Sequence, residues 1–299
     1  VDIVKVLLAA SGDIELCDAR GRNIFHYAAY GGFRVYSFLT AVATPAQVDR
    51  MLAAPDACGA LPISAAIAAL HLDVVVDLVD VRGFRVDTLD ARGRSLLYTA
   101  AAAASGPAAR KLVDRESELV IRALAARGGL LPHSPPVPHP VQIALANGDV
   151  ATAQVLASEL RDAGHPVDVV DAAGRSLVHY AALRGHVPAV LEALALLDAP
   201  DAPDAAPVNR ADTTGITAAH MAAGAGNIPL LQAVVAQGAN LAGLAASGLS
   251  PLHVAALSGH SKVVAFLLDA GVRAEARASR SAHLVTALHL AALGGARDV

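Results

Sequence analysis

The sequence is poor in large aromatic side chains. Of its 299 residues only 3% are Phe, Trp or Tyr and none is Trp, although 55% are hydrophobic. Much of the hydrophobic share is alanine, which is small and has the highest intrinsic helix propensity. Twenty-four Gly and sixteen Pro must interrupt the helices often. We therefore expect many short, closely packed helices rather than a few long ones.

Other shortages exclude whole classes of protein. Apolar runs such as Val74–Val76 and Ala100–Ala104 are far shorter than the roughly 18–20 residues of a membrane-spanning helix, so we expect no direct membrane insertion. A formal net charge of −4 does not favour nucleic acid as a partner, because nucleic-acid-binding domains are basic. The two cysteines, Cys17 and Cys58, are too few for a disulfide framework and favour a reducing, cytoplasmic location.

A short pattern recurs along the chain, which is typical of repeat proteins. Residues 18–29 (DARGRNIFHYAA) align with residues 90–101 (DARGRSLLYTAA) and 171–182 (DAAGRSLVHYAA). Five looser copies begin near residues 56, 134, 212, 245 and 281, and part of a further copy occupies residues 1–17. The spacing between copies runs from 33 to 44 residues, and we interpret the excess over 33 as loop insertions. The sequence thus predicts a single repeat domain over residues 1–299.

The clearest copy resembles a known family of repeats. Residues 250–260 read SPLHVAALSGH and continue into VVAFLLDAG over residues 263–271. This pattern resembles the ankyrin repeat family, whose unit carries a Thr-Pro-Leu-His element followed by Ala-Ala and Gly-His. The resemblance covers essentially the whole chain in about eight copies, with both terminal copies incomplete. It implies an all-α solenoid of stacked helix-turn-helix units with β-hairpin-like finger loops.

Each part of the pattern has a physical role. A Ser or Thr before the first helix caps it, and a following Pro loses nothing because the first N–H has no helical partner. The histidine that follows can share hydrogen bonds with that hydroxyl. Gly185, Gly226 and Gly259 are expected to end the first helices in the left-handed conformation. The Asp-x-x-Gly segments predict tight turns, which form fingers near Ala19–Arg22, Ala57–Ala60, Ala91–Arg94, Ala172–Arg175, Thr213–Ile216 and Ala246–Leu249.

Several segments depart from the pattern. The third copy has Ala104 where a helix-ending Gly is expected, and we predict a longer helix continuing through Gly106 toward Arg122. A proline-rich stretch over residues 130–140 and an acidic one over residues 198–207 are predicted insertions. Together they suggest a weak seam near residues 128–140, although the repeat phase resumes at once. Because both ends fall within a repeat, we expect the sequence to be a segment of a longer polypeptide.

The sequence offers no catalytic or metal-binding constellation. Five of its histidines recur at one repeat position, which favours a structural role: His26, His179, His220, His253 and His289. Adjacent repeats lie about 10 Å apart, too far for two such side chains to share a zinc ion. No nucleophile elbow and no phosphate-binding glycine loop is present. We therefore predict no metal site, no cofactor and no enzymatic activity.

The resemblance implies that a protein partner meets the concave groove of finger tips and first helices. Carried over by position, the groove residues are Arg20, Arg22, Arg92, Arg94, Arg175, Arg184, Ile216, Leu249, Leu257 and Leu293. Arginines toward the N-terminus and apolar residues toward the C-terminus predict a partner with an acidic stretch and a hydrophobic anchor, unless these arginines are merely solvated surface. We predict a scaffold or adaptor. A regulatory ankyrin segment of a larger enzyme or membrane channel is the alternative, and a self-contained enzyme is a third class.

Overall fold

The computed structural model describes residues 1–10, 12–104, 114–129, 137–197, 206–275, 278 and 285–294. The predicted repeat starts near 134 and 281, the continuation of the third copy over 105–113, and most of the acidic insertion lie outside these residues. The chain divides into two compact units. Unit 1 comprises residues 1–140 and 151–165, and unit 2 comprises residues 141–150 and 166–299.

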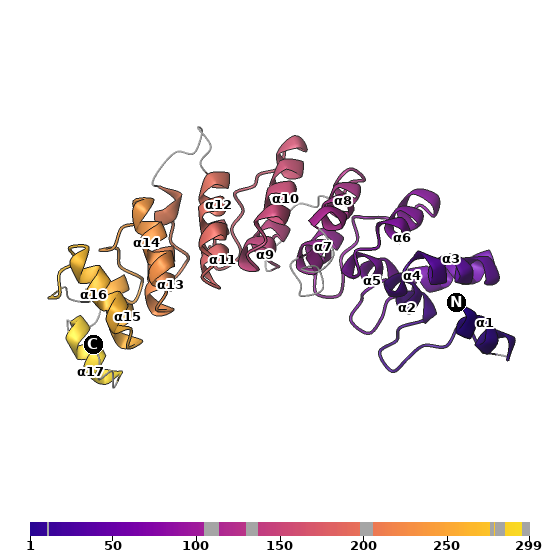
Figure 1. Cartoon of the computed structure of the whole chain (residues 1–299), viewed down its shortest axis with the longest axis horizontal. Coiled ribbons are helices and arrows are strands. Elements are labelled where there is room, and N and C mark those ends of the chain that lie inside the picture. The colour runs from indigo at the N-terminus through magenta and orange to yellow at the C-terminus, as the bar shows by residue number, and fades with distance from the viewer. Residues whose placement is uncertain are drawn as a thin grey trace. The chain divides into compact units, whose positions relative to one another are not determined.

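Unit 1 consists of inner and outer helices (Figure 1). Its inner helices are α2 (Ile24–Gly31), α5 (Pro62–Ala68) and α7 (Leu96–Ala104). Its outer helices are α1 (Asp2–Ala9), α3 (Phe33–Val42), α6 (Leu72–Val76), which continues as the π-helix η1 (Asp77–Val81), α8 (Asp114–Ala125) and α10 (Val150–Asp162). Helix α5 packs between α2 and α7, and α6 packs between α3 and α8. Each inner helix also contacts the outer helix that follows it.

Unit 2 repeats the same arrangement. Its inner helices are α9 (Pro140–Ala146), α11 (Leu177–Ala182), α13 (Ala218–Gly224), α15 (Pro251–Leu257) and α17 (Ala287–Leu293). Its outer helices are α12 (Val187–Leu197), α14 (Ile228–Ala236) and α16 (Ser261–Asp269), with a short 3-10 turn η3 (Pro207–Asn209). Helices α11, α13, α15 and α17 pack in series, and so do α12, α14 and α16. No β-strand is formed in the described residues, so the predicted all-α solenoid class is confirmed.

The fingers form where the sequence predicts them. In the first finger the Gly21 N–H donates to the Asp18 carbonyl at 2.9 Å, and the Asp18 N–H donates to the Arg22 carbonyl at 3.0 Å. Gly21 has φ of +72°, a conformation that only glycine adopts without strain. The same pair of bonds closes the fingers that begin at residues 56, 90, 171, 212 and 245.

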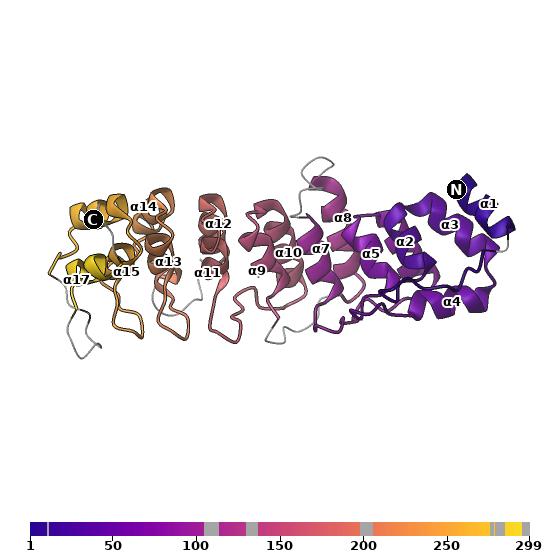
Figure 2. The ribbon, with the colours of Figure 1, turned by 90° about the horizontal axis from the view of Figure 1, so that it is seen from below.

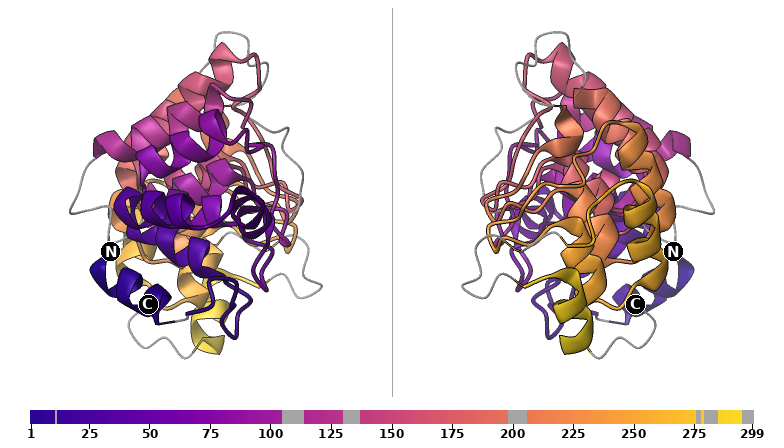
Figure 3. Two further views of the ribbon diagram at one scale, coloured as in Figure 1. Left: turned by 90° about the vertical axis from the view of Figure 1, so that its right-hand side faces the viewer. Right: turned by 90° about the vertical axis from the view of Figure 1, so that its left-hand side faces the viewer.

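Neighbouring fingers are joined through their backbones. The N–H of Ala57 donates to the Arg20 carbonyl at 2.8 Å in unit 1, and that of Ala246 donates to the Thr214 carbonyl at 2.7 Å in unit 2. The finger loops that precede α11, α13 and α15 project to one side of their helices (Figure 2). An end view of unit 2 shows these loops on the side away from its outer helices (Figure 3, right). The inner helices and the fingers thus share one face of unit 2.

The core of each unit combines small inner-helix residues with larger side chains. The alanine pairs of the inner helices are fully buried or nearly so, including Ala100 and Ala101 in unit 1. Such small side chains let helix axes approach closely. In the first repeat the fully buried rings of Phe25 and Tyr36 pack edge to face, with centroids 6.2 Å apart, which adds about 1 kcal/mol to the burial itself.

One predicted loop is a helix. The extra residues between the first and second copies form α4 (Pro45–Ala53) rather than an irregular insertion. The Gln47 N–H donates to the Thr44 hydroxyl at 3.3 Å, and the Thr44 N–H donates to the Gln47 side chain at 3.0 Å. This reciprocal capping box starts the helix, and Met51 and Leu52 bury its apolar face. The loop interpretation was therefore wrong here. The capping box and the buried apolar residues stabilise a helix although the repeat pattern has no helix at this place.

Three inner helices end at the predicted glycine, whereas the second and third repeats have Leu70 and Ala104 at this position. Gly185, Gly226 and Gly259 have φ of +72°, +69° and +75°, which confirms the left-handed helix ends. In the second repeat Leu70 occupies this position with φ of +59°, and among the described residues it is the one non-glycine residue with positive φ. A left-handed conformation costs an L-residue about 1–2 kcal/mol. This helix end is therefore strained.

Candidate binding surface on the fingers and inner helices

The recurring histidine links the start of one inner helix to the next finger. In the fifth repeat the Ser176 N–H donates to Nδ1 of His179 at 3.1 Å, and the Ser176 hydroxyl lies 2.9 Å from the same nitrogen. With Nδ1 as the acceptor, Nε2 carries the proton and donates to the Ile216 carbonyl at 2.9 Å. His26 and His220 make the equivalent contacts with the carbonyls of Ala60 and Leu249. These histidines connect successive repeats.

Burial disfavours the charged forms of His179 and His220. His179 and His220 are 1% and 2% exposed. Desolvation lowers the pKa of both imidazoles, and it outweighs the opposing effect of the hydrogen bonds to backbone carbonyls. An imidazole whose two nitrogens are both bound and whose charged form is disfavoured is a structural group. Within the described residues no three His, Cys, Asp or Glu side chains gather in a way that could hold a metal ion.

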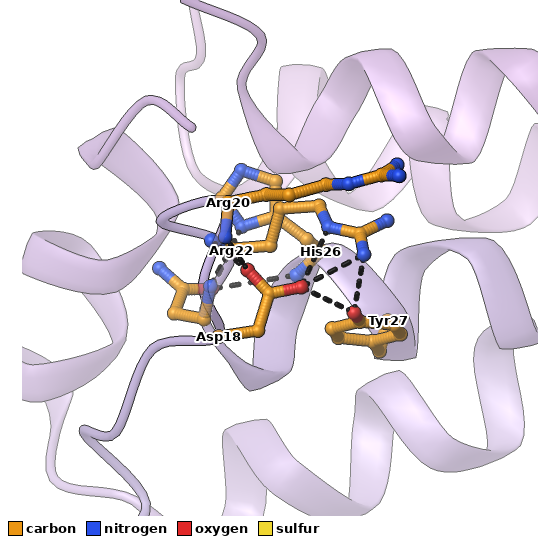
Figure 4. A network of polar contacts seen from close by, with 6 residues as sticks. Asp18, Arg20, Arg22, His26 and Tyr27 are labelled. Atoms are coloured by element: carbon orange, nitrogen blue, oxygen red, sulfur yellow. Dashed lines mark hydrogen bonds and ion pairs between the residues drawn. The ribbon is translucent and has the colours of Figure 1, made fainter. Parts of the chain in front are cut away.

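The arginine at the base of the first finger is bound to its own carboxylate (Figure 4). Nε of Arg22 donates to Oδ2 of Asp18 at 2.9 Å, and the Tyr27 hydroxyl donates to the same oxygen at 2.5 Å. The guanidinium also lies 4.7 Å from the centre of the Tyr27 ring. The hydrogen bond from Tyr27, followed by those from Arg22, lowers the pKa of Asp18. Asp18, Arg22 and Tyr27 form a closed ionic cluster.

Two further fingers contain the same Asp–Arg pair. Nε of Arg94 donates to Asp90 at 2.7 Å, and Nε of Arg175 donates to Asp171 at 2.7 Å. Tyr180 also donates to Asp171 at 2.8 Å. Burial alone would raise the pKa of Asp171. The hydrogen bonds from Arg175 and Tyr180 together lower it by more, so the pKa of Asp171 lies below its usual range. These carboxylates are ionised at neutral pH and neutralise their arginines.

The arginines predicted to line the groove therefore fall into two groups. Arg22, Arg94 and Arg175 are engaged with their own finger aspartates. The side chains of Arg20, Arg92 and Arg184 are exposed and form no ion pair within the described part of the chain. In Figure 4 the Arg20 side chain carries none of the marked contacts of the cluster. Only this second group has its full charge available to a partner.

The predicted apolar residues of unit 2 also differ in exposure. Leu257 on α15 is 41% exposed and Leu293 on α17 is 77% exposed. Ile216 and Leu249 are partly buried, and their carbonyls accept the inter-repeat histidine bonds. Leu183, which follows α11 and is 55% exposed, was not among the groove residues predicted from the sequence. The exposed leucines of this face are the ones able to bury apolar area against a partner.

Unit 1 contains a pocket between its fingers and inner helices. The pocket holds about 560 Å³ and extends across three repeats. Its aromatic lining is Tyr27, Tyr30 and Tyr98, and its ionised side chains are Arg22, Asp56, Asp90 and Arg94. Tyr27 and Tyr30 are 50% and 63% exposed. The sequence prediction missed these tyrosines and Asp56, because it assigned the groove from the recurring finger arginines and not from the aromatic positions that follow them.

The arrangement defines a helical-repeat protein whose inner helices and projecting fingers present a binding surface. Residues 196–278 match the family model described as ankyrin repeats (3 copies). Residues 196–278 thus contain ankyrin repeats, and the resemblance drawn from the sequence is confirmed there. The count of eight copies stays a prediction, since the match covers three. No curated protein matches the chain.

Ankyrin repeats are generally protein–protein interaction modules, and the family is typically non-enzymatic. Among the described residues, none of the helices combines the length and the apolar character needed to cross a bilayer.

Proposed function

We propose that the chain acts as a scaffold or adaptor that binds another protein through the surface formed by its fingers and inner helices. The observation that carries this proposal is the exposure of large side chains on this surface in a chain that contains ankyrin repeats. Tyr30 and Leu293 are 63% and 77% exposed although they lie on inner helices or at their ends. Exposed aromatic and aliphatic groups beside charged ones are typical of the anchors of a protein interface.

The finer features of the partner follow from charge and exposure. We propose that an acidic stretch of the partner contacts Arg20, Arg92 and Arg184, whose charges have no described ion-pair partner. A hydrophobic anchor lies near Leu257 and Leu293, where apolar area is exposed. Arg22, Arg94 and Arg175 hold the fingers in shape for these contacts.

The test is a kinetic binding measurement with a partner identified by crosslinking to the full chain. Charge reversal at Arg20 and Arg92 should slow association and weaken its salt dependence, because exposed rim charges act mainly on the rate of encounter. Leu257→Asp should leave association nearly unchanged and speed dissociation about tenfold or more, as loss of an apolar anchor does. Arg94 is avoided in this test because its reversal would also break the finger bond to Asp90.

A matched control lies on the outer helices. Leu191 on α12 is 42% exposed, nearly the same as Leu257, so Leu191→Asp introduces the same change on the opposite kind of surface. Binding that is unaffected by Leu191→Asp and weakened by Leu257→Asp supports the proposal. If Leu191→Asp abolishes binding while the finger and inner-helix variants bind like the parent, the proposal is wrong and the outer helices form the site.

A further inference from the structure

Asp56 breaks the charge pattern of the fingers. In the fingers that begin at residues 18, 90 and 171, the residue four positions after the aspartate is an arginine that binds its Oδ2 atom. In the second finger this position is Ala60. Oδ1 of Asp56 still accepts the N–H groups of Cys58 and Ala60, at 2.8 and 2.9 Å. Oδ2 accepts no hydrogen bond in the described part of the chain.

This carboxylate lines the pocket of unit 1. The pocket lies between two fingers whose arginines, Arg22 and Arg94, are already bound to Asp18 and Asp90. The charged residues that line the pocket are Arg22, Asp56, Asp90 and Arg94. Since Arg94 is bound to Asp90 and Arg22 is bound to Asp18, Asp56 is the lining carboxylate with no ion-pair partner in the described part of the chain. A partly buried carboxylate with a free oxygen attracts a cation more strongly than a fully solvated one does.

The remaining lining suits the rest of a long cationic side chain. Tyr30 is 63% exposed, and its hydroxyl forms no hydrogen bond within the described residues. An exposed tyrosine ring binds a cation through its face. Ala60, Leu61 and Ala65 provide an apolar wall, against which the methylene stem of a lysine or arginine can pack.

We propose that this pocket binds a cationic side chain, a lysine or an arginine, presented by the partner protein, with Asp56 as its counter-ion and Tyr30 as its aromatic contact. This inference rests on the proposed function, because it names one residue type of the partner that the surface would bind. The partner then combines acidic residues over the exposed arginines with a basic residue that enters the pocket of unit 1.

The test uses small mimics of the side chains, so that it does not depend on finding the partner. The probes are n-butylguanidinium and n-butylammonium, with n-butylurea as a neutral molecule of the same shape and valerate as an anion. The chain contains five tyrosines, so ¹³C-labelled tyrosine gives a small set of NMR signals. Tyr27, Tyr30 and Tyr98 line the pocket, while Tyr36 is buried and Tyr180 belongs to unit 2. The last two are internal references.

The expected result is that both cations shift the signals of the pocket tyrosines at millimolar concentration and leave the references unchanged. Butylurea should bind about tenfold more weakly, since a charge-assisted hydrogen bond is lost. Asp56→Asn should weaken cation binding about tenfold while its amide oxygen still accepts the two backbone bonds. Asp49→Asn, which removes an exposed charge on α4, should have no effect.

A second variant restores the pattern of the other fingers. Ala60→Arg places an arginine where Arg22 and Arg94 stand, so its guanidinium should bind Asp56 and fill the pocket. The cations should then no longer shift Tyr30, although circular dichroism shows an intact fold. The inference is wrong if butylurea or valerate binds as tightly as the cations, or if Asp56→Asn or Ala60→Arg binds the cations like the parent.

The two proposals fail in different ways. If Asp56→Asn leaves probe and partner binding unchanged while Leu257→Asp releases the partner, the cation site is wrong and the binding surface stands. If the probes bind as expected but a partner is lost only through changes on the outer helices, the pocket binds cations and the proposed function is wrong.

Discussion

His220 offers the clearest test of how one repeat holds the next. Its Nδ1 accepts the Thr217 N–H at 3.3 Å and lies 2.9 Å from the Thr217 hydroxyl, at the start of α13. Its Nε2 donates to the Leu249 carbonyl at 3.1 Å, in the finger of the following repeat. His220→Ala removes the imidazole's contact with the helix cap and the inter-repeat bond together.

The expected cost follows from these contacts. Two hydrogen bonds worth about 0.5–1.5 kcal/mol each are lost, and a partly buried carbonyl of Leu249 is left without its donor. The imidazole is 2% exposed, so its removal also leaves a small cavity that costs about 1 kcal/mol. His220→Ala should therefore reduce the free energy of unfolding by about 2–4 kcal/mol.

His289 supplies the matched control. It makes the same cap contact with Thr286, with the Thr286 N–H 3.3 Å from Nδ1, but it is exposed and its Nε2 has no described partner. His289→Ala should cost only about 1 kcal/mol, the value of a cap. Urea unfolding followed by circular dichroism at pH 7.5 measures both variants. Equal losses for His220→Ala and His289→Ala would refute the assignment of the larger cost to the inter-repeat bond.

Three further predictions concern stability. Leu70→Gly should raise the free energy of unfolding by about 0.5–1 kcal/mol because it relieves a φ of +59°; a lower melting temperature for this variant would contradict the reasoning. Asp171→Asn should lower the free energy of unfolding by about 1–2 kcal/mol, since a buried charge-assisted bond to Arg175 is lost while the amide oxygen still accepts the finger N–H groups. An unchanged urea midpoint would count against this prediction. Burial lowers the pKa of His179 and His220 below the usual 6.5. As the pH falls, the unfolded chain therefore binds protons at these two histidines before the folded chain does. Stability should be independent of these two groups above about pH 7.5 and fall below about pH 6.5, by at most about 1.4 kcal/mol per pH unit for each histidine; stability that rises between pH 6.5 and 5.5 would contradict this.

The features that the sequence predicted correctly depend on local chemistry. A Ser or Thr three residues before a histidine fixes a capped helix start, and Asp-x-x-Gly fixes a turn, whatever surrounds them. Gly226 and Gly259 could be assigned left-handed helix ends because few other residues adopt that conformation. These elements recur, so each copy supports the interpretation of the others. The helix pairs and fingers could therefore be placed from the sequence alone.

The features that the sequence did not predict depend on contacts across space. The second bond of His220, to the Leu249 carbonyl, joins residues 29 positions apart, and no local pattern shows it. The pairing of Arg22 with Asp18 depends on the finger turn, which brings residues four positions apart together outside any helix. Arginines that looked equivalent in the sequence thus separate into paired and unpaired groups. Helix α4 was missed for another reason: its capping box was visible, but the repeat period suggested a loop.

Asp56 shows how a repeat protein can acquire a specific site. Within the paired fingers the Asp–Arg bond is part of the structure, and its charge is neutralised inside the repeat. When one finger has alanine in place of the arginine, the turn survives because Oδ1 alone accepts the two backbone N–H groups. The second oxygen is then left for a ligand at little cost to the fold, since a partly exposed ion pair contributes only about 0–1 kcal/mol. The finger turn can therefore stay the same from repeat to repeat while the charge of the finger changes. Binding specificity along such a chain can be altered at the residue four positions after each finger aspartate.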